Sequence, residues 1–352
     1  MIDNLNAYLR DAIKFKNDLD EIAEISWQEK KTKNYIIKKL GEDYHWSKRT
    51  ALIYKIGNGI PIFFRTETDA LGTDSGPKHV CGHSSHTAAL MAAYLYFKEN
   101  PIAGVKLYFI FQPSEEGYPS GAKFISDNAK DIKECRAGFA FHVFPGYEKG
   151  ILINPVFASA DFFEINIYGK PTHIKNKNAD YKHDAILAAS KVVAEINSKL
   201  EDNWIINIGT IKGGESANKI AGTVYLTGDI RALTGVSRLC GKRFLERTCF
   251  EIQEANKGIK IKLTYHRGYP ILKNDQKLLK KVKKIFNIKA DIRSFAAEDF
   301  SLYPAPKIFL LIGTGNNKEL HTNEFEVDGD LIGFIFYNWI VLGKNLINIF
   351  NV

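Results

Sequence analysis

Helical and strand-like segments alternate along the first 155 residues of this 352-residue chain, and this alternation restricts its fold more than any other feature. The pattern opens with a helix that we expect to reach about Leu40. Beyond it, apolar strand-like runs lie near Leu52, Ile62, Leu107 and Phe139. Strands that alternate with helices favour a mostly parallel sheet covered by helices. We therefore predict an α/β fold of this kind.

Residues 159–267 follow a different pattern. Here we expect strands at 162–168, 204–211, 222–232 and 259–265, with helices at 184–200 and 237–256. This order predicts a small α+β lid with an antiparallel sheet, inserted into the larger domain. The larger domain then consists of residues 1–158 and 268–352, to which the chain returns through an apolar strand at 308–312.

Composition and charge exclude several classes of partner. The content of 45% hydrophobic and 25% charged residues is ordinary for a globular protein. The net charge is +8, but Lys and Arg are spread along the chain without an aromatic-basic motif, so we expect no nucleic-acid partner. The most apolar stretch, 331–342, is too short to span a bilayer and predicts a buried helix instead of a membrane contact. The first five residues lack a basic-then-apolar signal, which favours the cytoplasm.

The run Cys81-Gly82-His83-Ser84-Ser85-His86 places a thiol and two imidazoles within six positions. On a regular helix, Cys81 and His83 would point away from each other, because they are two residues apart. Both can reach one metal ion from an irregular turn, for which Gly82 supplies the backbone freedom. The apolar spacing that follows predicts a helix over 87–100.

Further residues of the metal-binding types each follow a strand-like segment. Glu115 and Glu116 come after an apolar run that Pro113 should end, and His142 and His321 also follow apolar runs. Ligands at strand ends match the usual position of sites in open α/β sheets. Taken singly, such residues are more often core histidines or solvated charge pairs. Together they favour a site for a borderline-soft divalent metal such as zinc or manganese.

Eight segments carry a wider resemblance, namely 65–71, 81–87, 111–116, 141–145, 213–218, 228–231, 297–301 and 320–321. With them the chain resembles the amidohydrolase branch of the aminoacylase/carboxypeptidase metallopeptidase superfamily. This branch includes hippurate hydrolases, indoleacetyl-amino-acid hydrolases and N-acetyl-diaminopimelate deacetylases. The resemblance covers most of the chain.

The resemblance implies a centre of two divalent ions, zinc or manganese in the first place and nickel or cobalt as alternatives. The positions that match the family's ligands are Cys81, His83, Glu116, His142 and His321. Cys81 matches the residue that bridges the two ions, and Glu115 matches the general base. Asp69 resembles a carboxylate that orients the site, a role expected around metal-bound imidazoles. A turn or helix-capping role is the alternative for Asp69.

The resemblance also assigns residues of the lid. His173 matches a histidine that stabilises the tetrahedral oxyanion, and its alternative is a strand-end histidine in solvent. Asn218 and Arg231 resemble residues that hold the substrate's carboxylate or carbonyl group. The alternative for Arg231 is an ion pair inside the lid. Lid closure and a homodimer are implied by the same resemblance.

The chain departs from the family at several positions. Ser84 and Glu67 stand where the family usually carries Asp, and the segment between Asp69 and Cys81 is shorter. These differences bear on the substrate pocket and leave every matched ligand in place. We predict hydrolysis of the amide bond of an N-acyl amino acid, with a deacetylase as one form. The alternatives are a dipeptidase or carboxypeptidase that uses the same centre, and a noncatalytic, metal-retaining binding protein.

Overall fold

The computed structural model describes residues 2–176, 183–199 and 201–351. The chain divides into two compact units. Unit 1 consists of Met1–Pro155, Lys273–Ile292 and Asp299–Val352. Unit 2 consists of Val156–Leu272 and Arg293–Glu298.

A sheet of nine strands forms the centre of the fold, in the order β1-β2-β6-β3-β7-β17-β8-β15, with β16 paired to β8. The strands are β1 Trp46–Lys48, β2 Ala51–Ile56, β3 Ile60–Glu67, β6 Val105–Gln112, β7 Ala137–Phe144, β8 Leu152–Phe157, β15 Leu272–Lys273, β16 Ile288–Ser294 and β17 Lys307–Gly313. The four central strands, β6, β3, β7 and β17, are parallel to their neighbours within this group. The strands β2 and β8 join this group on its two sides and run antiparallel to it. The predicted α/β fold with a mostly parallel sheet is confirmed.

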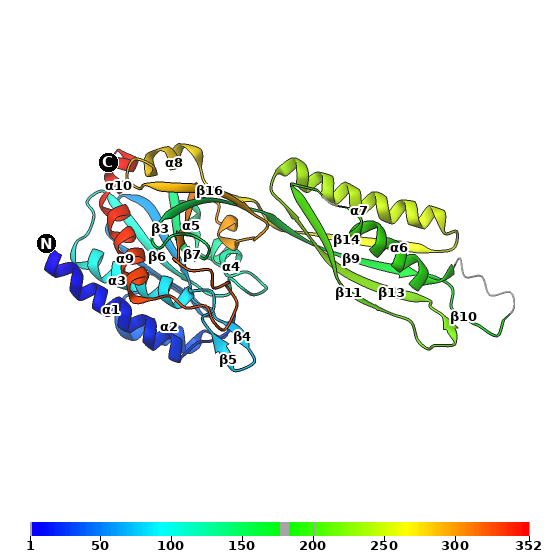
Figure 1. The fold of residues 1–352 in the computed structure, drawn as a ribbon. Coiled ribbons are helices and arrows are strands. Elements are labelled where there is room, and N and C mark those ends of the chain that lie inside the picture. Colours follow the sequence, from blue (N-terminus) through cyan, green and yellow to red (C-terminus); the bar gives the residue numbers. More distant parts are fainter. Residues whose placement is uncertain (1, 177–182, 200, 352) are drawn as a thin grey trace. The chain divides into compact units, whose positions relative to one another are not determined.

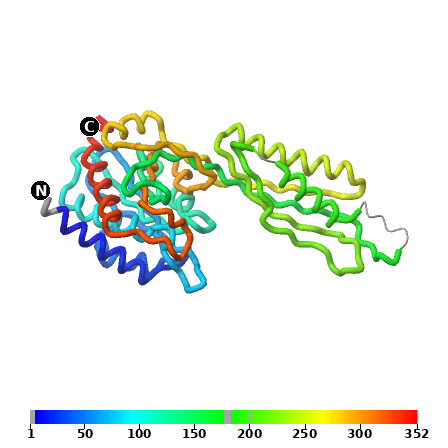
Figure 2. Tube along the Cα trace, viewed as in Figure 1, coloured from blue at the N-terminus to red at the C-terminus, as the bar shows by residue number. Residues whose placement is uncertain are grey.

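Two adjacent residues of β3 show that both faces of this sheet are covered, because successive side chains of a strand point to opposite faces. The ring of Phe64 lies 4.5 Å from Trp339 of helix α9 (Gly329–Lys344). The ring of Phe63 instead lies 5.0 Å from Tyr303, just after the 3₁₀ turn Asp299–Leu302. On the α9 side, α1 (Ile2–Glu21) and α3 (His83–Glu99) pack with α9 (Figures 1 and 2). The remaining elements of this unit are β4 Leu71–Thr73, β5 Gly76–Lys78, α4 Gly121–Asn128, α5 Lys130–Lys133, α8 Gln276–Val282 and α10 Leu346–Phe350.

The N-terminal helix differs from the prediction. A single helix to about Leu40 was expected, but the structure has two helices, α1 and α2 (Lys30–Leu40), joined by residues 22–29. This connection departs from helical geometry because Ile25 forms a bridge with Ala70 and Trp27 has a left-handed φ of 66°. Helix α3 also begins earlier than residue 87, so that His83 lies in its first turn.

Unit 2 contains an antiparallel sheet with the strand order β11-β13-β9-β14. These strands are β9 Ser159–Tyr168, β11 Trp204–Gly213, β13 Thr223–Ala232 and β14 Lys260–Tyr269. Helices α6 (Ala185–Asn197) and α7 (Gly235–Ala255) pack on it and close an apolar core (Figure 1). The predicted α+β arrangement with an antiparallel sheet is therefore confirmed. A short pair, β10 (Thr172–His173) with β12 (Lys219–Ile220), completes the unit.

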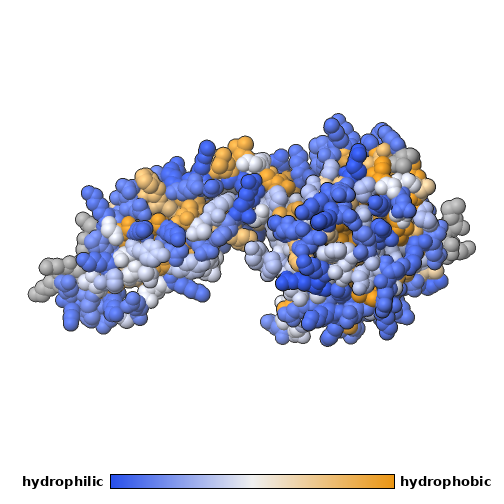
Figure 3. Space-filling model, turned by 180° about the vertical axis from the view of Figure 1, so that it is seen from behind, coloured by the Kyte–Doolittle hydropathy of each residue, from blue (hydrophilic) through white to orange (hydrophobic). Residues whose placement is uncertain are grey.

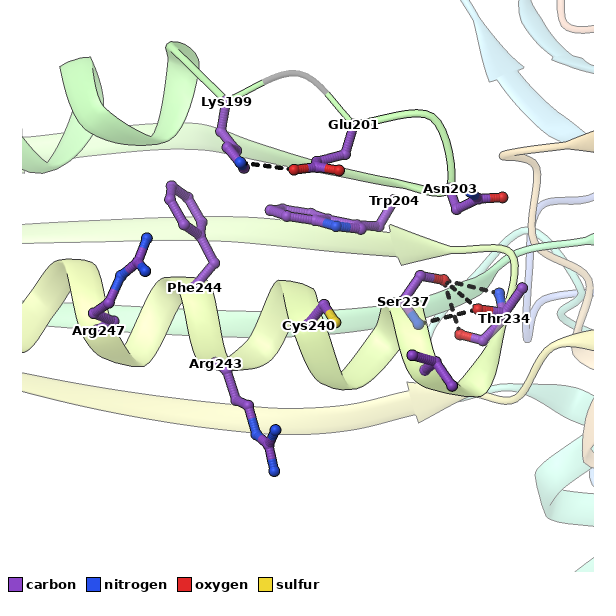
Figure 4. A pocket seen from close by; sticks show the side chains of 11 residues that line it. Lys199, Glu201, Asn203, Trp204, Thr234, Ser237, Cys240, Arg243, Phe244 and Arg247 are labelled. Carbon is purple, nitrogen blue, oxygen red and sulfur yellow. Dashed lines mark hydrogen bonds and ion pairs between the residues drawn. The ribbon is translucent and has the colours of Figure 1, made fainter.

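Unit 2 also has a cavity of about 680 Å³, lined on one side by α7 and on the other by Lys199, Glu201, Asn203 and Trp204 (Figure 4). None of the ten site residues predicted from the sequence, all of which the structure describes, is among its lining side chains. Hydrophilic residues cover most of the face in Figure 3, and hydrophobic residues form separate patches on it.

The apolar stretch 331–342 lies within α9, where Leu331, Ile335 and Trp339 are buried, as predicted. Among the residues that the structure describes, none of the helices combines the length and the apolar character that a membrane-spanning segment requires.

Candidate metal centre

Four parallel strands bring several of the predicted site residues to one edge of the central sheet. Asp69 follows β3, Glu115 and Glu116 follow β6, His142 lies two residues before the end of β7, and His321 follows β17. The carboxyl ends of parallel strands share an edge, which is the usual site position in open α/β sheets. The topology thus places these predicted site residues close together.

A left-handed turn at Gly82 directs Cys81 and His83 toward this edge. Gly82 has a φ of 88° and forms the N-cap of α3. A Cβ atom at this position would lie 2.5 Å from Val143 Cγ2, so a side chain would collide there. Glycine is therefore required both by the backbone angle and by the close approach of β7.

The thiol of Cys81 lies next to two imidazoles. Its Sγ is 3.5 Å from His142 Nε2 and 3.3 Å from His321 Nε2. His321 Nε2 in turn lies 3.0 Å from Glu116 Oε1. With His83, which lies in one group with Cys81 and His142, all five predicted ligands are close together.

The predicted ligand atoms form two overlapping groups. Within each group the donor atoms lie within 4.8 Å of one another, and the groups are Cys81, His83 and His142, and Cys81, Glu116 and His321. Cys81 belongs to both groups. A third group joins His83 to Glu115 and Glu116, with 3.9 Å between His83 Nε2 and Glu115 Oε2. This overlap is what a thiolate shared between two ions would require.

The backbone orients two of the imidazoles. His83 Nδ1 lies 2.9 Å from the carbonyl oxygen of Asp69, and His142 Nδ1 lies 2.7 Å from that of Val143. A carbonyl only accepts, so each Nδ1 carries the proton that it donates. The Nε2 atom of each ring is therefore the one that can offer a lone pair to a metal ion.

The electrostatics of the site reflect its burial. Burial and the neighbouring carboxylates raise the pKa of the Cys81 thiol well above its usual value. Burial lowers the pKa of His142 to about 4, so this ring is neutral at pH 7. Burial also opposes the charged form of His83, but the Asp69 carboxylate outweighs it and raises the pKa of His83 to about 9. Thiolate and neutral imidazole are the forms that bind metal, and a cation at the site would favour both.

The donors fit divalent ions of the zinc type. A thiol, three imidazoles and carboxylates are ligands for such ions. Among the residues that the structure describes, no group forms a hydrogen bond with His83 Nε2, although this atom is buried. A buried polar atom without a hydrogen bond is costly, and a metal ion would satisfy it.

The second histidine of the run, His86, has a different environment. Its Nε2 accepts a hydrogen bond of 3.0 Å from the backbone N–H of Val143, and its Nδ1 lies 3.1 Å from Glu67 Oε2. Both ring nitrogens are therefore used within the protein. Burial lowers the pKa of His86 to about 3, which keeps the ring neutral. His86 thus holds the strand next to His142 and presents no free nitrogen to a metal.

Two residues that the sequence analysis missed support the site from the connection between α1 and α2. Ser26 Oγ donates to Asp69 Oδ2 (2.7 Å), which also accepts the backbone N–H of Glu116 (3.0 Å). Glu29 Oε1 accepts the backbone N–H of Ser114 (2.9 Å). Burial raises the pKa of Glu29 to about 7. No pattern in the sequence signals these contacts, because Ser26 and Asp69 are 43 residues apart and Glu29 and Ser114 are 85 residues apart.

A buried charge network lies below the site. Arg65, which is fully buried, pairs with Glu67 and, at 2.6 Å, with Asp299. Asp299 also accepts hydrogen bonds from Gln112 Nε2 (2.9 Å) and Ser120 Oγ (2.7 Å). This carboxylate therefore connects β3, β6 and the start of α4. Burial opposes the charge of Glu67, but Arg65 lowers the pKa of Glu67 well below its usual value.

The three predicted residues of the lid lie in unit 2. His173 and Asn218 are neighbours, because His173 pairs with Lys219 between β10 and β12 and the Asn218 carbonyl accepts the N–H of Ile174. Arg231 Nε donates to Asp229 Oδ1 at 2.6 Å. This is the ion pair inside the lid that formed the alternative for Arg231.

A model of peptidase family M20/M25/M40 matches residues 64–332. The chain belongs to this family. The N-acetyldiaminopimelate deacetylase of Listeria innocua serovar 6a is 33% identical over 259 residues, which are 64% of this chain and 68% of that protein. The N-acetyl-L-cysteine deacetylase of Bacillus subtilis is 29% identical over 92% of this chain and 85% of that protein.

Solved structures share the fold of this family member. A dinuclear metal binding peptidase of the M20 family from Bacillus subtilis superposes with a TM-score of 0.81 at 24% identity, over 96% of this chain and 98% of that one. The aminobenzoyl-glutamate utilization protein from Klebsiella pneumoniae has a TM-score of 0.70 at 15% identity, over 97% and 98% of the two chains. These likenesses show a common fold.

Proposed function

We propose that this protein is a metal-dependent amidohydrolase that cleaves the amide bond of N-acyl amino acids. The reaction adds water to the acyl carbon and releases a carboxylic acid and a free amino acid. The observation that carries the proposal is the pair of overlapping ligand groups that share Cys81, with Glu115 in the adjoining group. Relatives named as deacetylases of N-acetyldiaminopimelate and N-acetyl-L-cysteine support the substrate class.

In this proposal Cys81, His83, Glu116, His142 and His321 would hold two divalent ions, with zinc or manganese expected first and nickel or cobalt as alternatives. Bound ions of this kind lower the pKa of water toward ~7 and polarise a carbonyl oxygen. Glu115 takes a proton from the attacking water and delivers it to the leaving amine nitrogen. Asp69 keeps the His83 ring in position, as its contact at 3.4 Å between Oδ1 and Nδ1 supports.

For the lid, with expected boundaries at 159 and 267, we propose roles in binding. His173 donates to the oxyanion, and Asn218 and Arg231 bind the carbonyl or carboxylate of the substrate. Arg231 would exchange its contact with Asp229 for the substrate's carboxylate. The homodimer expected from the resemblance stays a prediction, which light scattering tests.

The experiment uses metal-free protein refilled with Zn²⁺, Mn²⁺, Co²⁺ or Ni²⁺ and a panel of N-acyl amino acids and dipeptides. Metal-dependent release of amino acids from the acyl substrates supports the proposal. Release from dipeptides alone supports a peptidase instead, an alternative that the family's name favours.

A matched pair of variants separates an enzyme from a binding protein. In Glu115→Gln, turnover should fall by ~10²-fold or more, because the proton carrier is lost, while metal content stays unchanged. Glu148→Gln removes an exposed carboxylate and should leave turnover unchanged. Wild-type protein that binds metal and releases no product from any substrate would contradict the enzymatic proposal.

A further inference from the structure

Unit 1 has a cavity of about 540 Å³ at the start of α2. Its lining residues are Trp27, Lys30, Lys33, Asn34, Arg49 and Thr50. Three of these six side chains are cationic and none is a carboxylate. In the described part of the chain, none of the three cations forms an ion pair with a carboxylate, whereas Lys98, for example, pairs with Asp43 at 2.9 Å. The cavity therefore carries a positive charge without a counter-charge of its own.

The Arg49 side chain is fixed by stacking. Its guanidinium carbon lies 4.9 Å from the centre of the Trp27 ring and 5.5 Å from that of Phe124. Trp27 is held in turn by a hydrogen bond of 2.6 Å from Nε1 to the Pro119 carbonyl. A guanidinium that stacks on aromatic rings keeps its N–H groups in one plane and available to an anion.

The backbone at this cavity is in a conformation that side chains disfavour. Trp27 has a φ of 66° and Arg49 a φ of 52°. Two other non-glycine residues with positive φ, Ser114 and His321, belong to the candidate metal centre or its loop. Such conformations cost of order 1 kcal/mol each and are enriched at binding sites. The cavity shares this property with the metal centre.

Lys33 joins the two sides of the cavity. It is half-buried, and its Nζ donates a hydrogen bond of 2.7 Å to the carbonyl oxygen of Arg49. Burial lowers the pKa of Lys33, so its charged form would gain from an anion nearby. The Glu29 carboxylate is fully buried and outside the lining, where it accepts a hydrogen bond from Thr50 Oγ1 (2.8 Å).

We propose that this cavity is a binding site for a compact dianion, namely a phosphate group. Arg49 supplies a planar fork that suits phosphate oxygens, and Lys30 and Lys33 supply point charges. The phosphate comes either as the free ion or as the phosphoryl group of a small metabolite. The proposal is independent of the hydrolytic function, since it concerns binding at residues outside the metal centre.

The test is calorimetric titration of the full-length protein, at constant ionic strength, with inorganic phosphate and with ethyl phosphate. Phosphate also binds metal centres, so the titration is done on both metal-loaded and metal-free protein. We expect saturable binding of one anion per chain in both forms. Tighter binding of the ester indicates a phosphorylated metabolite, and tighter binding of the free ion indicates inorganic phosphate; each supports the site.

Variants locate the binding. Arg49→Gln and, separately, Lys33→Gln should weaken binding at least about tenfold, since a hydrogen bond between charged groups is lost. Lys31→Gln is the matched control, because it removes the same charge from an exposed neighbour outside the lining, and it should change binding less than about twofold. Circular dichroism and thermal melting check that each variant is folded.

Three results would overturn the proposal. The first is the absence of saturable binding to the wild-type protein. The second is binding that is lost when the metal is removed, which would assign it to the metal centre. The third is equal weakening by Lys31→Gln and by both lining variants, which would indicate attraction to the overall charge alone.

Discussion

Ser26 Oγ donates a hydrogen bond of 2.7 Å to Asp69 Oδ2, so the connection between the first two helices orients a carboxylate beside the candidate metal centre. The same Asp69 oxygen accepts the backbone N–H of Glu116, a proposed ligand. One carboxylate therefore links the N-terminal segment, a ligand loop and the His83 ring. Removal of the Asp69 carboxylate should weaken metal binding more than it lowers the free energy of unfolding.

Asp69→Asn should weaken binding of zinc by about 10–100-fold, because the carboxylate that orients the His83 ring and makes it a more basic ligand is lost. Titration of metal-free protein against a chromophoric chelator measures the affinity. Asp74→Asn changes an exposed carboxylate in the turn between β4 and β5 and should have no effect. Equal affinities for wild type and Asp69→Asn would show that Asp69 does not act through the metal site.

Cys81→Ser should reduce the metal content by at least one ion per chain, because a serine hydroxyl is a much poorer ligand than a thiolate. The two ligand groups both contain Cys81, so the loss is expected to affect both. Elemental analysis after dialysis measures the content. Cys240→Ser, which replaces an exposed thiol, serves as the control. An unchanged metal content in Cys81→Ser would show that Cys81 is not a ligand shared by two ions.

Arg65→Met should lower the free energy of unfolding by about 3–5 kcal/mol, because it leaves the buried carboxylates of Glu67 and Asp299 without their cation. Lys98→Met breaks a comparable pair with Asp43 at the surface and should cost less than about 1 kcal/mol. Denaturation in guanidinium chloride compares the two. Similar small losses for both would mean that the buried network contributes little.

The pKa of Glu29, raised to about 7 by burial, predicts a pH dependence of stability. The pKa is higher in the folded than in the unfolded chain, so the unfolded chain loses this proton first as the pH rises. The free energy of unfolding should therefore fall between pH 4.5 and about 7 by an amount on the order of 3 kcal/mol relative to Glu29→Gln. Urea denaturation of both proteins across this range measures the difference. A difference that is constant with pH would contradict the raised pKa.

Local sequence patterns predicted much of the fold. The apolar run before Pro113 became β6, and the periodic stretch 331–342 became α9. The helix over 87–100 began four residues earlier, at His83, because Gly82 provides a left-handed N-cap that apolar spacing does not reveal. The first helix was predicted too long, because the contacts of residues 22–29 are made with distant segments, such as the bridge from Ile25 to Ala70.

The proposed ligands could be picked out in the sequence because each residue type has a distinctive chemistry, as with the thiol of Cys81 and the imidazole of His142. Supporting residues could not be read in this way. Glu29 is an ordinary charged residue before a helix, and only the folded chain brings it to Ser114. The same holds for His86, whose contact with the backbone of Val143 depends on the packing of α3 against β7.

The contact between Cys81 and His321 joins residues that are 240 positions apart, and this separation has a consequence for the newly made protein. At ~5–20 residues per second, a ribosome needs roughly 10–50 s to travel between these two codons. During that time the thiol and the imidazoles that we propose as ligands are already made, whereas their last proposed partner is not. The proposed centre is therefore complete only once the final strand and the segment after it exist, so its full metal content should be reached only after synthesis ends.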